Sequence, residues 1–190
     1  SMPQAKLDLM SYIDSGRYAQ DVAEIVKQAK KDLARDLVAV ERPALVLDID
    51  ETALSNLEYE IGTNFCFTSE SWAEFVAAAD APALQPTLDL YNFAQEQGVA
   101  VFFVTGRRER SRGDTERNLH FAGYGEWQHL YLKSNDYDLP TAATYKTAAR
   151  QAIVDQGYTI VLNMGDQPSD LEGGLAKRAV KLPNPFYETP

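Results

Sequence analysis

The first residues of this sequence whose types and spacing could support a reaction are two aspartates that follow an apolar run. Asp48 and Asp50 flank Ile49 directly after Ala44–Leu47. Because side chains alternate in an extended chain, both carboxylates can face one side of a short turn. One carboxylate at such a site can attack phosphorus, while the other donates a proton to the leaving oxygen and later accepts one from water. The alternative interpretation is an acidic turn that caps a helix, where aspartate is common.

Two further segments carry groups that can bind an anion. Thr105 and Gly106 follow the apolar run 99–104, and a hydroxyl with backbone N–H groups at a junction between strand and helix forms a small anion cradle. Lys146 stands at the start of a predicted helix, where a cation opposes the helix dipole, so an anion nearby would explain its position. The alternatives are an ordinary loop relieved by glycine and a solvated surface lysine.

Two more aspartates, Asp166 and Asp170, suit a magnesium ion. They lie around a Gly/Pro turn directly after an apolar run, and magnesium prefers oxygen ligands. The residues of this segment are also turn formers, so an ordinary turn is the alternative. Four aspartates at one edge of a sheet would repel one another unless a divalent cation and a lysine offset their charge. A phosphate dianion needs the same two cations, so the aspartates and Lys146 together are consistent with one phosphate-binding site.

The elements that must position these residues alternate between apolar runs and amphipathic helices. Five apolar runs have the length of strands buried on both faces: residues 44–47, 99–104, 130–132, 159–162 and 179–182. Helical patterns at residues 88–97, 114–121 and 145–156 are each followed by glycine. We therefore expect an α/β fold, a Rossmann-like open parallel sheet of about five strands with helices on both faces. Ligands bind such a sheet beyond the carboxyl ends of its strands, where Asp48, Thr105 and Asp166 fall.

The length of 190 residues fits a single domain, predicted over residues 1–190. Residues 1–40 are predicted as an N-terminal helical extension, because apolar residues spaced by three and four form a stripe on a helix over 18–37. Residues 55–84 are predicted as a small insert near the site, too short for a large cap domain. Five of its side chains either line a pocket mouth or pack against the N-terminal helices, and packing is the favoured interpretation: Asn56, Tyr59, Phe65, Phe67 and Trp72.

Composition and charge exclude several classes of protein. The formal net charge of −10 argues against nucleic acid or an anionic membrane as the main partner, and no run approaches the ~20 apolar residues of a membrane span. The single cysteine, Cys66, rules out an internal disulfide and is expected to be a small buried hydrophobe. No signal peptide is visible, and because Ser1-Met2 resembles a cloning remnant, a leader can have been removed. The residues leave the compartment and any homo-oligomer open.

The remaining basic residues carry weaker signals. Arginines at positions 107, 108, 110 and 112 either attract an anionic substrate or form a solvated face with ion pairs to Glu109 and Asp114. The chain has two histidines, His120 and His129, so chemistry with a histidine nucleophile is hard to build. His120 lies late in a predicted helix and is expected to cap or pack.

Five segments, in this order, share their wording with one protein family: Asp48-Ile49-Asp50-Glu51-Thr52-Ala53-Leu54-Ser55-Asn56, Thr105-Gly106-Arg107-Arg108-Glu109, Tyr145-Lys146, Gly165-Asp166-Gln167 with Ser169-Asp170, and Lys181-Leu182-Pro183-Asn184-Pro185. The set resembles the motifs of the haloacid dehalogenase (HAD) superfamily. Within it, the sequences of these segments are most similar to those of the class B-type acid phosphatases and plant vegetative storage proteins of HAD subfamily IIIB. Pro168 departs from the plant-like pattern, where a bulky aromatic residue is expected, and leaves the shape of the pocket open.

The resemblance implies roles for the first two motifs. Asp48 would be the nucleophile and a magnesium ligand. Asp50 would be the general acid and base, and would bind Mg²⁺ through its backbone carbonyl. Thr105 and the Gly106 N–H would hold phosphate oxygens. Dehalogenating members of the superfamily lack the second aspartate, so the presence of Asp50 favours phosphoryl chemistry.

The resemblance also implies roles for the third and fourth segments. Lys146 would offset charge on the nucleophile and on the phosphoryl group. Asp166 would be the third protein ligand of Mg²⁺. Asp170 would either support the metal site by contacting the ligands or form a bond with Lys146. An acidic pH preference and export to the periplasm or outside the cell are implied in the same way.

These features predict a magnesium-dependent acid phosphatase that hydrolyses small phosphomonoesters, with nucleotides and sugar phosphates as candidates, through an aspartyl-phosphate on Asp48. A storage or binding protein with weak activity is one alternative, and the intact Asp48 disfavours it. A phosphotransferase that uses an alcohol acceptor is a second. A receiver-type phospho-switch has a shorter domain and nothing like residues 165–170. A dinucleotide-binding enzyme fits poorly, because Gly123-Tyr124-Gly125 follows a helix and lacks a third glycine.

Overall fold

The computed structural model describes residues 2–190, with side chains from residue 4 onward. Its strands are β1 (Pro43–Leu47), β2 (Ala100–Arg108), β3 (His129–Lys133), β4 (Thr159–Gly165) and β5 (Ala176–Lys181). Its helices are α1 (Met2–Asp14), α2 (Arg17–Asp36), α3 (Leu57–Gly62), α4 (Ser69–Ala78), α5 (Gln85–Glu96), α6 (Arg112–Ala122) and α7 (Ala143–Asp155). Two 3₁₀ turns are η1 (Glu109–Ser111) and η2 (Pro168–Asp170). The predicted alternation of strands and helices is confirmed.

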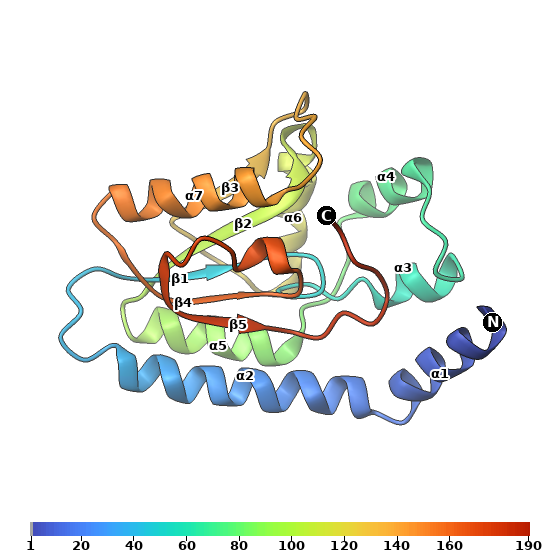
Figure 1. Cartoon of the computed structure of the whole chain (residues 1–190), viewed down its shortest axis with the longest axis horizontal. Helices are drawn as coiled ribbons and strands as arrows, with labels where there is room; N and C mark the ends of the chain where they lie inside the picture. Colours follow the sequence, from blue (N-terminus) through green and yellow to red (C-terminus); the bar gives the residue numbers. More distant parts are fainter. Residues whose placement is uncertain (1) are drawn as a thin grey trace.

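The sheet places β1 at its centre. All pairs of neighbouring strands are parallel, in the order β3-β2-β1-β4-β5. The chain adds β2 and β3 on one side of β1 and then returns to add β4 and β5 on the other side (Figure 1). The strand order therefore switches between β1 and β4, which opens a crevice beyond their carboxyl ends. Polar residues that follow these two strands lie side by side there.

Side chains of β1 serve two cores, which is why this strand is a continuous apolar run. Leu45 and Leu47 pack in the larger core with side chains of α2, α5 and α6. Ala44 and Val46 pack in the smaller core with side chains of α7. Figure 1 shows α2 and α5 on one side of the sheet and α7 on the other. The predicted parallel sheet with helices on both faces is confirmed.

The N-terminal extension consists of α1 and α2, and Ser1 of the range predicted for it lies outside the described residues. The apolar stripe of α2 is buried against the sheet and α5: Tyr18, Val22, Val26, Ala29 and Leu33. The helix predicted over residues 18–37 is therefore confirmed. Across residues 2–190, no helix combines the length and the apolar character that crossing a bilayer requires.

Two segments close over the carboxyl edge of the sheet. The insert between β1 and α5 carries α3 and α4, and α4 packs against α6. Residues 183–190, here called the C-terminal strap, follow β5 and run past the same edge (Figure 1). The ring of Phe186 in the strap lies 5.3 Å from that of Tyr18 and 6.3 Å from that of Phe65, between centroids. The strap is thus wedged between α2 and the insert.

Three local predictions are wrong. β2 does not end at Val104 but continues through Thr105 and Gly106 to Arg108, because Arg108 resumes the pairing with β3 after a register shift. β5 begins at Ala176, ahead of the predicted run, because alternate residues of this edge strand are exposed and no apolar run marks its start. Cys66 is exposed in the loop between α3 and α4 and is not a core residue.

Candidate active site

Three aspartates meet in the crevice between β1 and β4. Asp48 follows β1, and its N–H donates to the carbonyl of Met164 in β4 at 3.1 Å, which ties the two strand ends together. One carboxylate oxygen from each of Asp48, Asp166 and Asp170 lies within 4.8 Å of the others, and all three residues are buried. The structure therefore brings together three of the four aspartates that the sequence analysis selects.

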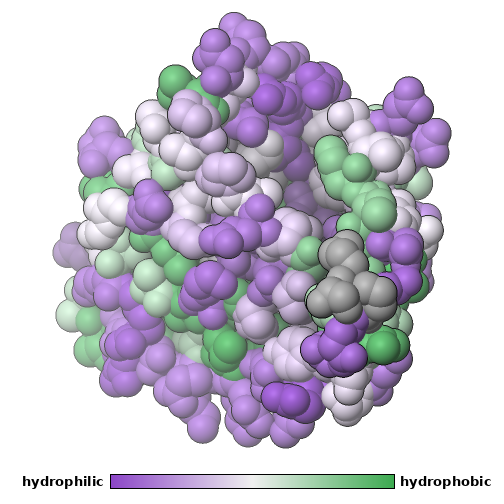
Figure 2. Space-filling model, turned by 45° about the vertical axis from the view of Figure 1, so that its right-hand side comes forward, coloured by the Kyte–Doolittle hydropathy of each residue, from purple (hydrophilic) through white to green (hydrophobic). Residues whose placement is uncertain are grey.

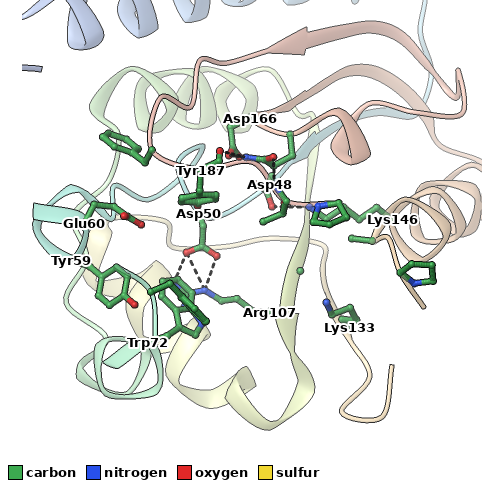
Figure 3. A pocket seen from close by; sticks show the side chains of 18 of the residues that line it. Asp48, Asp50, Tyr59, Glu60, Trp72, Arg107, Lys133, Lys146, Asp166 and Tyr187 are labelled. Atoms are coloured by element: carbon green, nitrogen blue, oxygen red, sulfur yellow. Dashed lines mark hydrogen bonds and ion pairs between the residues drawn. The ribbon is translucent and has the colours of Figure 1, made fainter. Parts of the chain in front are cut away.

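Lys146, in the first turn of α7, directs its ammonium group into this cluster (Figure 3). Its Nζ lies 3.6 Å from Asp48 Oδ1 and forms a close ion pair with Asp170. Burial alone would lower the pKa of Lys146, but the carboxylates of Asp48 and Asp170 outweigh burial and raise it, so the ammonium stays protonated. The anion expected near this helix start is the aspartate cluster.

The single ammonium group of Lys146 does not neutralise three carboxylates, so the cluster keeps excess negative charge. Burial raises the pKa of Asp48 well above its ordinary value, and Asp170 and Asp166 add to the rise while Lys146 opposes it. Burial likewise raises the pKa of Asp170, where Lys146 again opposes the effect and Asp166 reinforces it. A divalent cation would relieve this repulsion, and grouped carboxylate oxygens are the ligands that magnesium prefers. The donor set therefore fits a magnesium ion.

The fourth aspartate, Asp50, faces an arginine instead of the cluster. Arg107 holds its carboxylate with two atoms, Nη2 at 2.8 Å from Oδ1 and Nε at 3.1 Å from Oδ2 (Figure 3). Asn56 donates a further hydrogen bond to Oδ1 at 2.8 Å. Burial alone would raise the pKa of Asp50, but the charge and hydrogen bonds of Arg107, with the bond from Asn56, outweigh burial and lower it. Asp50 is thereby held as a carboxylate that points into the cavity.

Arg107 is a site residue whose contact with Asp50 the sequence analysis does not predict. Its side chain is 2% exposed, so the solvated face, one of the two alternatives for this stretch, is wrong at this position. Arg107 lies in β2 beyond the predicted strand end, and strand alternation turns it inward. The predicted ion pair to Glu109 is present from Arg112, whereas Asp114 pairs with Arg117. The missed signal was the continuation of β2 past the apolar run.

Thr105 and Gly106 lie in β2 beside the cluster, inside the strand and not at the predicted junction. Gly106 lines the cavity, and a Cβ added there would meet nothing within 4 Å. Thr105 is fully buried, and its hydroxyl oxygen accepts the N–H of Arg107 at 3.1 Å. A hydroxyl that accepts in this way keeps its own proton for another acceptor. Thr105 therefore keeps a hydroxyl proton directly behind Gly106, which lines the cavity.

Glu51 is a second buried residue that the sequence analysis assigns no role. Its carboxylate accepts the Asn56 N–H at 2.8 Å and the hydroxyl of Tyr187 from the C-terminal strap. Burial raises the pKa of Glu51 well above its ordinary value, and the Asp50 carboxylate adds to the rise. The signal for this network is the stretch from Asp48 to Asn56, in which a run of polar residues directly follows a buried strand.

These groups open into a cavity of about 490 Å³, visible as a hollow on the face shown in Figure 2. Charged side chains form its base, and aromatic side chains of the insert form part of its wall: Tyr59, Phe65, Phe67 and Trp72. The interpretation of these four as pocket residues is therefore confirmed, and the favoured interpretation, packing against the N-terminal helices, is wrong for them. Asn56 is fully buried behind Asp50 and Glu51.

A family model described as HAD superfamily, subfamily IIIB (Acid phosphatase), matches residues 2–190. The chain belongs to this acid phosphatase family. The resemblance inferred from the motifs is confirmed, and membership of subfamily IIIB supports the predicted phosphatase activity.

Relatives of this subfamily IIIB chain include plant proteins. It is 41% identical over 182 residues to stem 28 kDa glycoprotein of Glycine max, covering 93% of this chain and 71% of that protein. It is 39% identical over 178 residues to acid phosphatase 1 of Solanum lycopersicum, covering 92% of this chain and 65% of that protein. It is 34% identical over 187 residues to vegetative storage protein 1 of Arabidopsis thaliana, covering 94% and 67%. The chain thus spans about two thirds of the length of these relatives.

A solved structure shares the fold of this subfamily IIIB chain. The class C acid phosphatase from Bacillus anthracis superposes with a TM-score of 0.80 at 22% sequence identity, covering 97% of this chain and 86% of that one. The architecture predicted from the alternating runs is therefore that of an acid phosphatase with the HAD fold.

Gly165 leaves the space that Asp170 needs, which gives a direct test of the cluster. A Cβ at Gly165 would lie 2.3 Å from the Asp170 Cβ and 2.5 Å from its Oδ2. We expect Gly165→Ala to displace Asp170 from Lys146, to lower phosphatase kcat by about 10-fold or more and to lower the free energy of unfolding by about 1–3 kcal/mol. Steady-state kinetics and urea titration measure these effects. Gly113→Ala is the control, because a Cβ there meets nothing within 4 Å; equal losses in both variants would contradict the prediction.

Proposed function

We propose that this subfamily IIIB protein is a magnesium-dependent acid phosphatase that hydrolyses small phosphomonoesters through an aspartyl-phosphate on Asp48. The observation that carries the proposal is the buried cluster of Asp48, Asp166 and Asp170 around the ammonium of Lys146. Such a cluster concentrates a nucleophile, a cation and oxygen ligands at one end of the sheet. We take residues 1–190 as one phosphatase domain, in which the insert at 55–84 forms part of the pocket wall.

The proposed metal ligands are the carboxylates of Asp48 and Asp166 and the backbone carbonyl of Asp50, with Asp170 beside them. When bound, magnesium supplies positive charge that offsets these carboxylates and the phosphate oxygens. The protein supplies further donors to the phosphate oxygens: the Lys146 ammonium, the Thr105 hydroxyl and the Gly106 N–H. These donors are fixed before the substrate arrives, so little reorganisation accompanies the reaction.

The reaction proceeds in two displacements at phosphorus. An Asp48 oxygen attacks, the bond from phosphorus to the ester oxygen breaks, and the Asp50 carboxyl gives its proton to the leaving alcohol. Asp50, now a carboxylate, takes a proton from water while the water oxygen attacks phosphorus and the Asp48 oxygen departs. Inorganic phosphate leaves, Asp48 is free, and Asp50 again carries a proton. The lowered pKa of Asp50 restricts its protonated form to acidic pH, which supports an acidic optimum.

The cavity supports small phosphomonoesters as substrates, with nucleotides and sugar phosphates as candidates. Its volume of about 490 Å³ suits a molecule of that size. We also propose that the natural protein is exported. The relative from Glycine max is named a glycoprotein, and N-linked glycans are carried by secreted proteins.

The experiment that tests the function is hydrolysis of p-nitrophenyl phosphate from about pH 4.5 to about pH 8, with magnesium and with EDTA. We expect turnover that requires magnesium, falls with EDTA, returns when magnesium is restored and is greatest at acidic pH. Turnover that is unaffected by EDTA would remove the metal from the proposal. Absence of turnover at every pH, with magnesium bound, would replace the enzyme with a storage or binding protein.

A phosphotransferase is the second candidate, because the cavity of about 490 Å³ has room for a small acceptor beside the phosphate. In that reaction an alcohol replaces water in the second displacement, and Asp50 takes the proton of the alcohol. Glycerol or a nucleoside added to the assay would then yield a new phosphate ester at the expense of inorganic phosphate. Chromatographic analysis of products separates the two reactions. The similarity to vegetative storage protein 1 keeps the storage role as the outcome if neither product forms.

A further inference from the structure

The C-terminal strap is bonded to the candidate active site at several points. Three of its contacts anchor it to the surrounding elements: the Tyr187 hydroxyl donates to Glu51, the Thr189 N–H donates to Gln167 Oε1 at 2.9 Å, and the Pro190 carbonyl accepts the Ala142 N–H at 3.2 Å. The strap therefore crosses from the loop after β1, past the loop after β4, to the start of α7. A fourth contact reaches an aspartate of the cluster.

Asn184 makes that fourth contact, and both ends of its amide are used. Its Nδ2 donates to Asp166 Oδ2 at 2.8 Å. Its Oδ1 accepts the N–H groups of Phe186 at 2.9 Å and Tyr187 at 3.1 Å, which shapes the turn of the strap. Because the same side chain forms the turn and bonds the carboxylate, the path of the strap fixes the position of the donor.

The Asp166 carboxylate is held by donors from three separate segments. Asn184 and the Gln167 Nε2 both donate to Oδ2, the latter at 2.9 Å. The Thr52 hydroxyl donates to Oδ1 at 3.1 Å. Donors on both oxygens fix the rotation of a carboxylate about its last torsion angle. Asp166 is only 2% exposed, so solvent competes little for these bonds.

This restraint opposes the repulsion within the cluster. Asp48 and Asp170 place negative charge within 4.8 Å of the Asp166 carboxylate, which favours rotation of that group away from them. If the Asp166 carboxylate has rotated away, it must be reoriented before it can bind a cation. The free energy of that reorientation lowers the affinity for the cation. Groups that hydrogen-bond metal ligands commonly set affinity in this way.

We propose that Asn184 is a positioning residue that holds Asp166 in the orientation required for divalent-cation binding, so that the C-terminal strap preassembles the metal site. The inference rests on the proposed function in taking Asp166 as a ligand. Asn184 touches neither substrate nor metal in this role. Its effect falls on metal affinity and not on chemistry at saturating metal.

The test is calorimetric titration of chelator-treated protein with MgCl₂. Asn184→Ala removes both ends of the amide, and Asn184→Ser keeps an oxygen acceptor for the turn but is too short to reach Asp166. We expect the magnesium Kd to rise about 10- to 100-fold in both variants. At saturating magnesium, we expect kcat to stay within about threefold of wild type, because the bound cation itself attracts Asp166.

Asn118→Ala is the matched control. Asn118 is buried, whereas Asn184 is partly buried, and like Asn184 it uses both ends of its amide, accepting the Ala81 N–H at 3.2 Å and donating to the Ala81 carbonyl at 2.7 Å. It lies in α6, and both of its side-chain hydrogen bonds go to Ala81 and not to Asp48, Asp166 or Asp170, so its loss should lower Tm while the magnesium Kd stays unchanged.

Two results would overturn the inference. One is a magnesium Kd in the Asn184 variants within about twofold of wild type, because the lost bond would then not matter for affinity. The other is an equal rise in Kd in Asn118→Ala, which would indicate general destabilisation. Either result leaves the wild-type magnesium requirement intact and so contradicts only the role of the strap. A wild-type protein that binds no magnesium would instead remove the metal from the proposed function and the strap's role with it.

Discussion

Replacement of Asp48 by asparagine is expected to lower kcat for p-nitrophenyl phosphate by at least about 1,000-fold, because the amide cannot form the phosphoryl bond that the first displacement requires. Asparagine has nearly the same volume, so the side chain still fits between β1 and β4. The remaining acids, Asp166 and Asp170, stay in place around Lys146. Stopped assays with wild-type protein as reference measure the loss.

Stability separates a catalytic loss from a folding defect in this variant. Burial and two neighbouring carboxylates raise the pKa of Asp48, so its ionised form is unfavourable in the fold. The neutral amide relieves that repulsion, and we expect Tm at neutral pH to be equal to or above that of wild type. Retention of more than a few per cent of activity, at unchanged Tm, would remove Asp48 from the nucleophile role.

The parallel sheet could be predicted because burial on both faces demands continuous apolar runs. The apolar run of β1 is buried in two cores, one on each face of the sheet, as expected for a central strand. The edge strand β5 is exposed at every second residue, so its beginning carried no such run and was placed too late. The core strands were therefore predictable from local pattern, whereas the edge was defined by its pairing with β4.

The aspartate cluster could be predicted for a related reason. Asp48 directly follows β1 and Asp166 directly follows β4, and neighbouring parallel strands have their carboxyl ends at the same edge of the sheet. The partners of these acids depend on contacts between distant segments. Asp50 meets Arg107 across 57 positions, and Asp166 meets Asn184 across 18. No local periodicity encodes those pairs, so the sequence leaves the role of Arg107 open and marks the strap only through a family motif.

Replacement of Arg107 by methionine is expected to lower kcat at the acidic optimum by about 100-fold and to move the alkaline limb of the pH profile to higher pH. The variant removes two of the three donors to the Asp50 carboxylate, leaving Asn56. Burial is then opposed only by the Asn56 bond and the charge of Lys146, so the pKa of Asp50 rises. A general acid with a higher pKa stays protonated to higher pH, which sets the direction of the shift. Profiles of kcat/KM against pH measure it.

Arg107→Lys distinguishes charge from geometry. Lysine restores a positive charge near Asp50 but cannot hold both carboxylate oxygens in the fixed fork of a guanidinium. We expect its alkaline limb to return toward that of wild type while kcat stays low, because Asp50 is charged correctly but positioned loosely. A Met variant whose limb and kcat both match wild type would mean that Asp50 is not the proton donor. A Lys variant with full kcat would mean that Arg107 acts only through its charge. The planar guanidinium would then serve to pack beneath Trp72, whose ring centroid lies 5.5 Å from the guanidinium carbon.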